Sequence, residues 1–200
     1  MKKKTIIQII ALIIIIALIS FYFINQNKKA KEEIQNPREK ILAKYLEFKV
    51  LNENILQEAK ERYQKKYELT KEKLLNDPEN FIAWVDLGII KKGVNDYQGA
   101  EEAWLHLGEI RPKNSTSFGN LGDLYDHFLK DYPKSEWAYK KAIENSMAEP
   151  QNANYYEGLF KLYYFHYLEK KDLAKPTLEE ALKNNSDSEL LKSLWQEYYK

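Results

Sequence analysis

A short pattern occurs three times between residues 78 and 159 of this 200-residue chain. Each copy begins with a proline, has an asparagine two residues later, an aromatic residue six after the proline and a leucine three residues further on. The prolines are Pro78, Pro112 and Pro150, so the copies begin 34 and 38 residues apart. Matched offsets in three copies indicate one repeated structural unit, and a period of this length is typical of stacked supersecondary units.

Each unit contains two stretches with the periodicity of an α-helix. In the first stretch, the aromatic residue, the leucine and a residue seven after the aromatic share one face. In the second, spacings of three, four and three residues place a small residue between large ones. Each unit is therefore predicted to be a helical hairpin, and the hairpins are expected to stack because one hairpin cannot bury its own apolar face.

The pattern resembles the tetratricopeptide repeat, a 34-residue helical hairpin. In the first two units Gly88 and Gly122 follow the leucine, where they are expected to allow close approach of the second helix. The second unit has one extra residue between its helices, and the third has Phe160 in place of the glycine. The residues that carry the resemblance are Trp84, Leu87, Gly88, Tyr97, Ala100 and Trp104, then Phe118, Leu121, Gly122, Tyr125, Tyr132, Ser135, Tyr139 and Ala142, then Tyr156, Leu159 and Tyr163.

The resemblance implies an all-α, tetratricopeptide-like helical-hairpin solenoid over residues 77–185, with repeats at 78–111, 112–149 and 150–185. Residues 186–200 are predicted to form a capping helix, because Ser186 and Glu189 have the spacing of a capping box and a solenoid end needs a cover.

Residues 38–76 contain no glycine or proline and are predicted to form a long helix. This helix is either a stalk or a degenerate first repeat, and a break near Asn52 is the alternative to one continuous helix. Its apolar stripe is interrupted at Arg62 and Lys66, so a homodimeric coiled coil through this segment is not favoured.

Residues 5–24 carry no charged side chain and are mostly isoleucine, leucine and alanine. As an α-helix this run would be about 30 Å long, the thickness of a bilayer's hydrocarbon core. The basic tail at residues 1–4 favours a cytoplasmic N-terminus, so the run is predicted to be a transmembrane signal anchor with the bulk of the chain outside the cytoplasm. A cleaved signal peptide is the alternative, but the run is longer than a typical signal-peptide core. Polar residues 25–37 are predicted to be a linker.

Composition argues against several classes of function. The chain has no cysteine, which excludes disulfides, thiolate zinc sites and cysteine nucleophiles. A net charge of +1 and scarce arginine argue against a nucleic-acid partner. The histidines His106, His127 and His166 fall in separate predicted helices, so neither a metal nor a cofactor is expected. We find no catalytic constellation, and the chain is not predicted to be an enzyme.

The resemblance implies a concave groove, lined by the first helices of the hairpins, in which a peptide or protein segment docks. The chaperone-binding members of the family clamp a terminal carboxylate with basic residues, whereas here Asp123 and Asp126 occupy the groove. A mixed or partly basic segment is therefore the expected ligand. Carried over position by position, the groove residues are Val85, Ile89, Lys92, Gly119, Asp123, Asp126, His127, Glu157, Lys161 and Tyr164.

Two functions follow as hypotheses. The leading one is a membrane-tethered scaffold that binds a protein or peptide partner, held to the membrane through residues 5–24. Similar anchored repeat proteins serve assembly and secretion in bacterial envelopes, and this analogy suggests the same compartment. The alternative is a structural envelope protein that self-associates through the 38–76 helix.

Overall fold

The computed structural model describes residues 16, 18–26, 42–146 and 152–200. The chain divides into two compact units, Met1–Lys44 and Tyr45–Lys200. In the first unit, residues 18–26 are helical, and apolar side chains such as Phe21 are exposed. No helix in the described ranges is long and apolar enough to cross a bilayer. Most of the predicted membrane segment, the whole basic tail and nearly all of the predicted linker lie outside the described residues, so the anchor stays a prediction.

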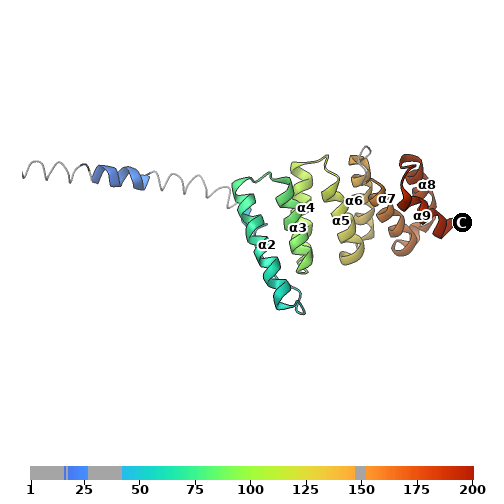
Figure 1. Ribbon diagram of the computed structural model, residues 1–200, viewed down its shortest axis with the longest axis horizontal. Helices are drawn as coiled ribbons and strands as arrows, with labels where there is room; N and C mark the ends of the chain where they lie inside the picture. The colour runs from blue at the N-terminus through green and yellow to red at the C-terminus, as the bar shows by residue number, and fades with distance from the viewer. Residues whose placement is uncertain (1–15, 17, 27–41, 147–151) are drawn as a thin grey trace, which may run out of the picture. The chain divides into compact units, whose positions relative to one another are not determined.

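The second unit is all-helical over its described residues, which confirms the predicted all-α class. Successive helices lie side by side in chain order, from α2 to α9 (Figure 1). The elements are α2 (Gln57–Asn76), α3 (Phe81–Gly93), α4 (Tyr97–Ile110), α5 (Thr116–Asp123), the π-helix η1 (Leu124–Leu129), α6 (Tyr132–Asn145), α7 (Asn152–Lys161), the π-helix η2 (Leu162–His166), the 3-10 helix η3 (Leu168–Leu173), α8 (Ala174–Asn184) and α9 (Glu189–Tyr199).

Helix pairs α3–α4, α5–α6 and α7–α8 correspond to the three predicted hairpins, and the two helices of each pair are in contact. Apolar and aromatic residues of the repeat pattern form the core between them, while Tyr97 and Tyr132 are half-buried. The buried repeat positions are Trp84, Leu87, Gly88, Ala100, Trp104, Phe118, Leu121, Gly122, Tyr125, Ser135, Tyr139, Ala142, Tyr156, Leu159 and Tyr163.

Two tryptophans show how the first hairpin closes. The indole of Trp84 donates to the carbonyl of Pro78 at 2.7 Å, and the indole of Trp104 donates to the carbonyl of Val85 at 3.3 Å. Both side chains are fully buried, so these bonds remove the cost of leaving an indole N–H unpaired. A Cβ atom on Gly88 would lie 2.2 Å from Nε1 of Trp104, which confirms that this position must be glycine for the helices to approach.

Asparagines of the repeat pattern lie at the starts of the first helices of the first two units. Asn80 accepts a hydrogen bond from the backbone N–H of Ala83 at 2.9 Å, and Asn114 accepts one from that of Ser117 at 2.7 Å. The third unit differs, because Asn152 lies inside α7 and donates to the carbonyl of Ile143. The corresponding Pro150 lies outside the described residues.

The predicted helix over residues 38–76 is a shorter helix preceded by an irregular segment. Residues 46–56 contain no helix, and α2 begins only at Gln57. Tertiary contacts override helix propensity here: the backbone N–H groups of Leu51 and Asn52 donate to the carbonyl of Val94 at 2.9 and 3.0 Å. Lys91 donates to the carbonyl of Glu47 at 2.7 Å.

The final helix α9 forms as predicted, but its cap is different. Ser188, not Ser186, is the N-cap residue, and its hydroxyl accepts from the backbone N–H of Leu191 at 3.4 Å. Leu191 and Leu194 are buried against the third hairpin. Phe160, which replaces the pattern's glycine, packs on Tyr198 of α9 with ring centroids 5.4 Å apart. The third hairpin therefore uses that position to hold the end helix.

We expect Gly88→Ala to lower the free energy of unfolding by about 1–2 kcal/mol, because the overpacking against Trp104 exceeds the gain in helix propensity. Chemical denaturation followed by circular dichroism measures the change. Gly108→Ala is the matched control, since its Cβ would lie 3.0 Å from the Phe118 ring, a milder contact, and its loss should be smaller. Equal stability of Gly88→Ala and the unsubstituted chain would contradict the packing described.

Glu136 on α6 makes the fold sensitive to acid. Burial raises the pKa of its carboxyl, but hydrogen bonds from Lys140, Lys170 and Tyr163 outweigh burial and lower that pKa to about 2. The stabilisation is therefore present above the unfolded-state pKa of 4.5 and is lost as pH falls from there toward 2.

We expect Glu136→Gln to show a shallower loss of unfolding free energy between about pH 6 and about pH 3 than the unsubstituted chain, by about 1–2 kcal/mol. Denaturant titrations at both pH values measure this difference. Parallel pH dependence in the two proteins would show that the Glu136 carboxylate is not stabilised in the folded state.

Candidate functional site

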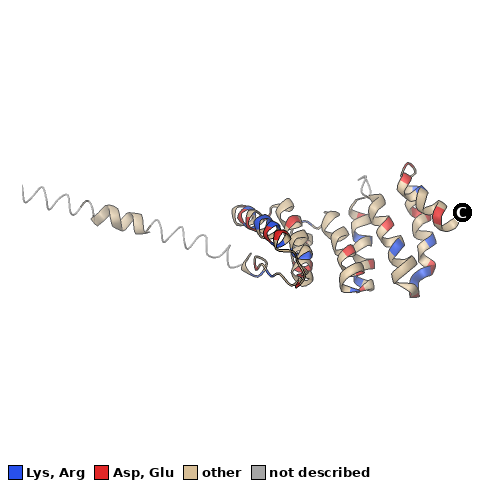
Figure 2. Ribbon diagram, turned by 60° about the horizontal axis from the view of Figure 1, so that its bottom comes forward, with Lys and Arg blue, Asp and Glu red and all other residues tan. Residues whose placement is uncertain are grey.

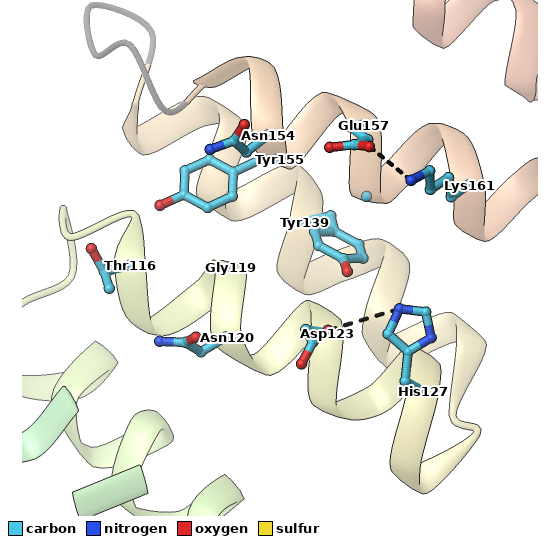
Figure 3. A pocket seen from close by; sticks show the side chains of 11 residues that line it. Thr116, Gly119, Asn120, Asp123, His127, Tyr139, Asn154, Tyr155, Glu157 and Lys161 are labelled. Atoms are coloured by element: carbon cyan, nitrogen blue, oxygen red, sulfur yellow. Dashed lines mark hydrogen bonds and ion pairs between the residues drawn. The ribbon is translucent and has the colours of Figure 1, made fainter. Parts of the chain in front are cut away.

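A pocket of about 350 Å³ lies between α5 and α7, the first helices of the second and third hairpins (Figure 3). Tyr139 of α6 forms its floor, and polar side chains from the two first helices form its walls. The lining residues are Thr116, Gly119, Asn120, Asp123 and His127 on one side, Asn154, Tyr155, Glu157, Gly158 and Lys161 on the other, and Tyr139 between them.

Glycines set the width of this pocket. A Cβ on Gly122 would lie 2.6 Å from the Tyr139 ring, and a Cβ on Gly158 would lie 2.5 Å from the same ring. One tyrosine ring thus packs directly against the backbones of both first helices. Burial raises the pKa of Tyr139, and the negative charges of Asp123, Asp126 and Glu157 raise it further, so its hydroxyl stays protonated.

The charged groups of the pocket are paired with one another. Lys92 of α3 lies 2.7 Å from Asp123, and Lys161 lies 2.7 Å from Glu157. His127 Nε2 lies 3.8 Å from the second oxygen of Asp123. These side chains keep roughly a quarter to a half of their surface exposed, so each pair is worth little in stability and can exchange for a ligand's charge.

The other end of the pocket is polar but uncharged. Asn120 and Asn154 line it from opposite helices, and neither side chain makes a hydrogen bond to another described residue. Each amide offers two donors and an acceptor. Tyr155 lies over α5 at this end, where a Cβ on Gly119 would meet its ring at 2.2 Å. This end can accept a ligand's backbone groups without breaking an existing contact.

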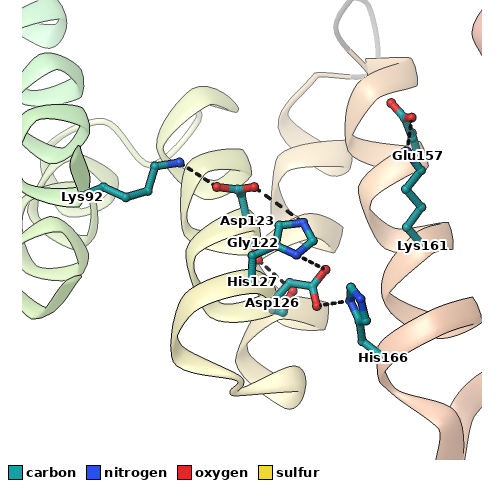
Figure 4. A network of polar contacts seen from close by, with 9 residues as sticks. Lys92, Gly122, Asp123, Asp126, His127, Glu157, Lys161 and His166 are labelled. Atoms are coloured by element: carbon teal, nitrogen blue, oxygen red, sulfur yellow. Dashed lines mark hydrogen bonds and ion pairs between the residues drawn. The ribbon is translucent and has the colours of Figure 1, made fainter. Parts of the chain in front are cut away.

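The structure gathers part of the predicted groove set into this pocket: Gly119, Asp123, His127, Glu157 and Lys161. Lys92 reaches it through its ion pair with Asp123 (Figure 4).

The remaining groove candidates lie elsewhere. Ile89 lines a separate cleft between α2 and α3. Tyr164 packs on Tyr198 with ring centroids 4.8 Å apart. Asp126 is 1% exposed and contacts His166, so it does not line the pocket. Val85 does not line the pocket either, and its carbonyl accepts from Trp104.

Sequence reasoning missed two features. Asn120, Asn154 and Tyr155 were not among the predicted residues, although the amide pair is visible once α5 and α7 are aligned. The sequence placed the histidines in separate helices and predicted no polar cluster that includes one of them. In the structure, His166 Nδ1 lies 2.6 Å from Asp126 Oδ1. No local pattern in the sequence signals this contact, because it joins positions 40 residues apart.

No protein-family model matches the chain, and a search of curated proteins gives no match either. The resemblance to the tetratricopeptide repeat stays a prediction from the residue pattern, and the geometry of the pocket is the basis for assigning a function.

Charge reversal at Asp126 should destabilise the fold much more than charge reversal at Asp123. We expect Asp126→Lys to lower the free energy of unfolding by about 3 kcal/mol or more, because it buries an uncompensated charge. Asp123→Lys should change it by about 1 kcal/mol or less, since the site is partly exposed. Thermal and denaturant unfolding distinguish the two variants; comparable losses would mean that Asp126 is not buried as described.

Proposed function

We propose that this chain is a membrane-tethered scaffold that binds a peptide or protein segment in the α5–α7 pocket. The observation that carries the proposal is the open pocket between two first helices. At one end its amides make no hydrogen bond to another described residue, and at the other end its ion pairs are exchangeable. An anchor at residues 5–24 would hold this binding domain at the membrane, outside the cytoplasm. Anchored scaffolds of this kind act in envelope assembly or secretion, which is the role we favour.

The pocket's chemistry suits an extended segment. Asn120 and Asn154 can bond to backbone N–H and C=O groups of a ligand, which gives affinity without demanding one sequence. The face of Tyr155 offers an apolar contact beside them. Such a combination of rigid aromatic and adaptable amide is common in surfaces that bind peptides.

The charged end favours a ligand with both signs of charge, or a basic one. Asp123 and Glu157 face the opening, and a basic side chain of the ligand would compete with Lys92 or Lys161 for them. Lysines and acidic residues are interspersed along the helices rather than gathered by sign (Figure 2). Recognition is therefore expected to depend on local pairing in the pocket and not on a long-range field.

A binding role fits the pocket better than catalysis. Among the described residues that line the pocket, Thr116, Tyr139 and Tyr155 carry the hydroxyl groups, and the raised pKa of Tyr139 disfavours a phenolate nucleophile. The alternative of self-association through α2 is less favoured, because Tyr67 and Leu74 of that helix are already buried within the chain.

Photocrosslinking of the full-length chain in its native membrane tests the proposal. A photoreactive residue at Asn120 lies in the pocket, and one at Glu179, an exposed residue of α8, is the matched control. We expect a distinct adduct from position 120 alone, which mass spectrometry then identifies. Only self-adducts, or equal adducts from both positions, would overturn the pocket as the binding site and favour the self-associating alternative.

A further inference from the structure

Two imidazoles and a carboxylate meet at the ends of α5–η1 and α7–η2, the first helices of the second and third hairpins (Figure 4). Asp126 and His127 come from η1, and His166 is the last residue of η2. One ligand atom from each of the three residues lies within 4.8 Å of the others. Asp126 and His166 are 40 residues apart in the sequence, so the fold and not local sequence brings His166 to the other two residues.

Asp126 has the features of a cation ligand. Its side chain is 1% exposed, and Oδ1 lies 2.6 Å from His166 Nδ1. Its second oxygen, Oδ2, is buried and makes no hydrogen bond within the described part of the chain. His127 Nδ1 lies 3.6 Å from this oxygen, too far for a hydrogen bond. A buried carboxylate oxygen that accepts no hydrogen bond is costly, so a cation bound at this position would stabilise it.

We propose that Asp126, His127 and His166 bind a divalent first-row transition-metal ion, with Zn²⁺ as the representative ion. Two imidazole nitrogens and one carboxylate oxygen are a donor set that such ions take, whereas Mg²⁺ and Ca²⁺ prefer oxygen ligands throughout. With bonds of about 2.0–2.1 Å, tetrahedral ligand atoms lie about 3.3 Å apart, so small side-chain rotations close the site. The fourth position is left for water.

Neighbouring groups orient both histidines. Asp123 Oδ1 lies 3.8 Å from His127 Nε2, so His127 has its other nitrogen, Nδ1, directed to Asp126. Asp123 is itself held by Lys92 at 2.7 Å. A carboxylate behind a ligating imidazole fixes the ring and strengthens the ligand. The ring of Tyr132 stacks on His166, with centroids 6.3 Å apart.

The cluster is reachable from solvent. The His127 side chain is 45% exposed and that of His166 is 29% exposed, so an ion can enter although Asp126 is buried. Both histidine-bearing segments are π-helical, and π-turns occur frequently at functional sites. A simple Asp126–His166 ion pair would explain neither why Asp126 Oδ2 accepts no hydrogen bond from the described residues nor the orientation of His127.

Isothermal titration calorimetry of the full-length chain in detergent, purified without a histidine tag and stripped with a chelator, tests the site with ZnCl₂ as the probe. We expect one Zn²⁺ per chain. His127→Ala, His166→Ala and Asp126→Asn should each weaken binding at least about tenfold, and Asp123→Asn about tenfold through the orientation of His127. His106→Ala is the matched control, because His106 lies in the first hairpin and packs between Tyr45 and Trp84, and it should leave Zn²⁺ affinity unchanged.

Circular dichroism and thermal unfolding establish that each variant is folded. If the His166→Ala variant does not fold, the His127→Ala variant tests the metal site instead, because the His127 side chain is largely outside the core. Co²⁺ substitution adds a spectroscopic readout, since intense visible bands indicate a tetrahedral site with histidine ligands. No Zn²⁺ binding by the unsubstituted chain, or unchanged affinity in His127→Ala, would overturn the proposal. Crosslinking from Asn120 can be repeated with chelator present, so loss of the metal site and loss of the peptide site are distinguishable.

Discussion

The close packing of one tyrosine ring against two helix backbones is the constraint on which the second half of the structure depends. Tyr139 lies where a Cβ on Gly122 or on Gly158 would stand, so it contacts the backbones of α5 and α7 together. Because this ring cannot be compressed, it sets how far apart the two first helices lie. The same ring forms the floor of the pocket, so the spacing of the hairpins and the size of the candidate binding site have a single physical cause.

The π-helical ends of the first helices in the second and third hairpins are the second determinant. The second unit has one more residue before its second helix than the first unit has. The helix that begins as α5 continues as the π-helix η1 to Leu129, and this continuation accommodates the extra residue. In a π-turn the hydrogen bonds span one residue more than in an α-helix, so the side chains that follow are rotated. This change of direction accompanies the placement of Asp126 in the interior beside His166, while Asp123, one turn earlier, faces the pocket.

Features of the fold that depend on neighbouring residues could be predicted from the sequence. Gly88 followed a leucine on a helix face, and Asn80 preceded an apolar periodic run, so close packing and capping could both be expected. Features that depend on distant contacts could not. The irregular segment at residues 46–56 has helix-forming composition, and it is held by the carbonyl of Val94, more than forty residues away. The contact between Asp126 and His166 likewise requires two hairpins to be in place.

The pocket and the histidine cluster share one continuous set of polar groups. Lys92, Asp123, His127, Asp126 and His166 follow one another at 2.7, 3.8, 3.6 and 2.6 Å, and Asp123 and His127 also line the pocket. A ligand that replaces Lys92 as the ion-pair partner of Asp123 changes the electrostatic potential at His127. A cation bound beside His127 in turn changes how strongly the Asp123 carboxylate attracts a ligand's positive charge. Binding at two sites that share groups in this way is reciprocally coupled. Substituting Asp123 or His127 would therefore perturb both proposed sites. Asn120 lies only in the pocket and His166 only in the cluster, so substitutions at these two positions would separate the proposed peptide binding from the proposed cation binding.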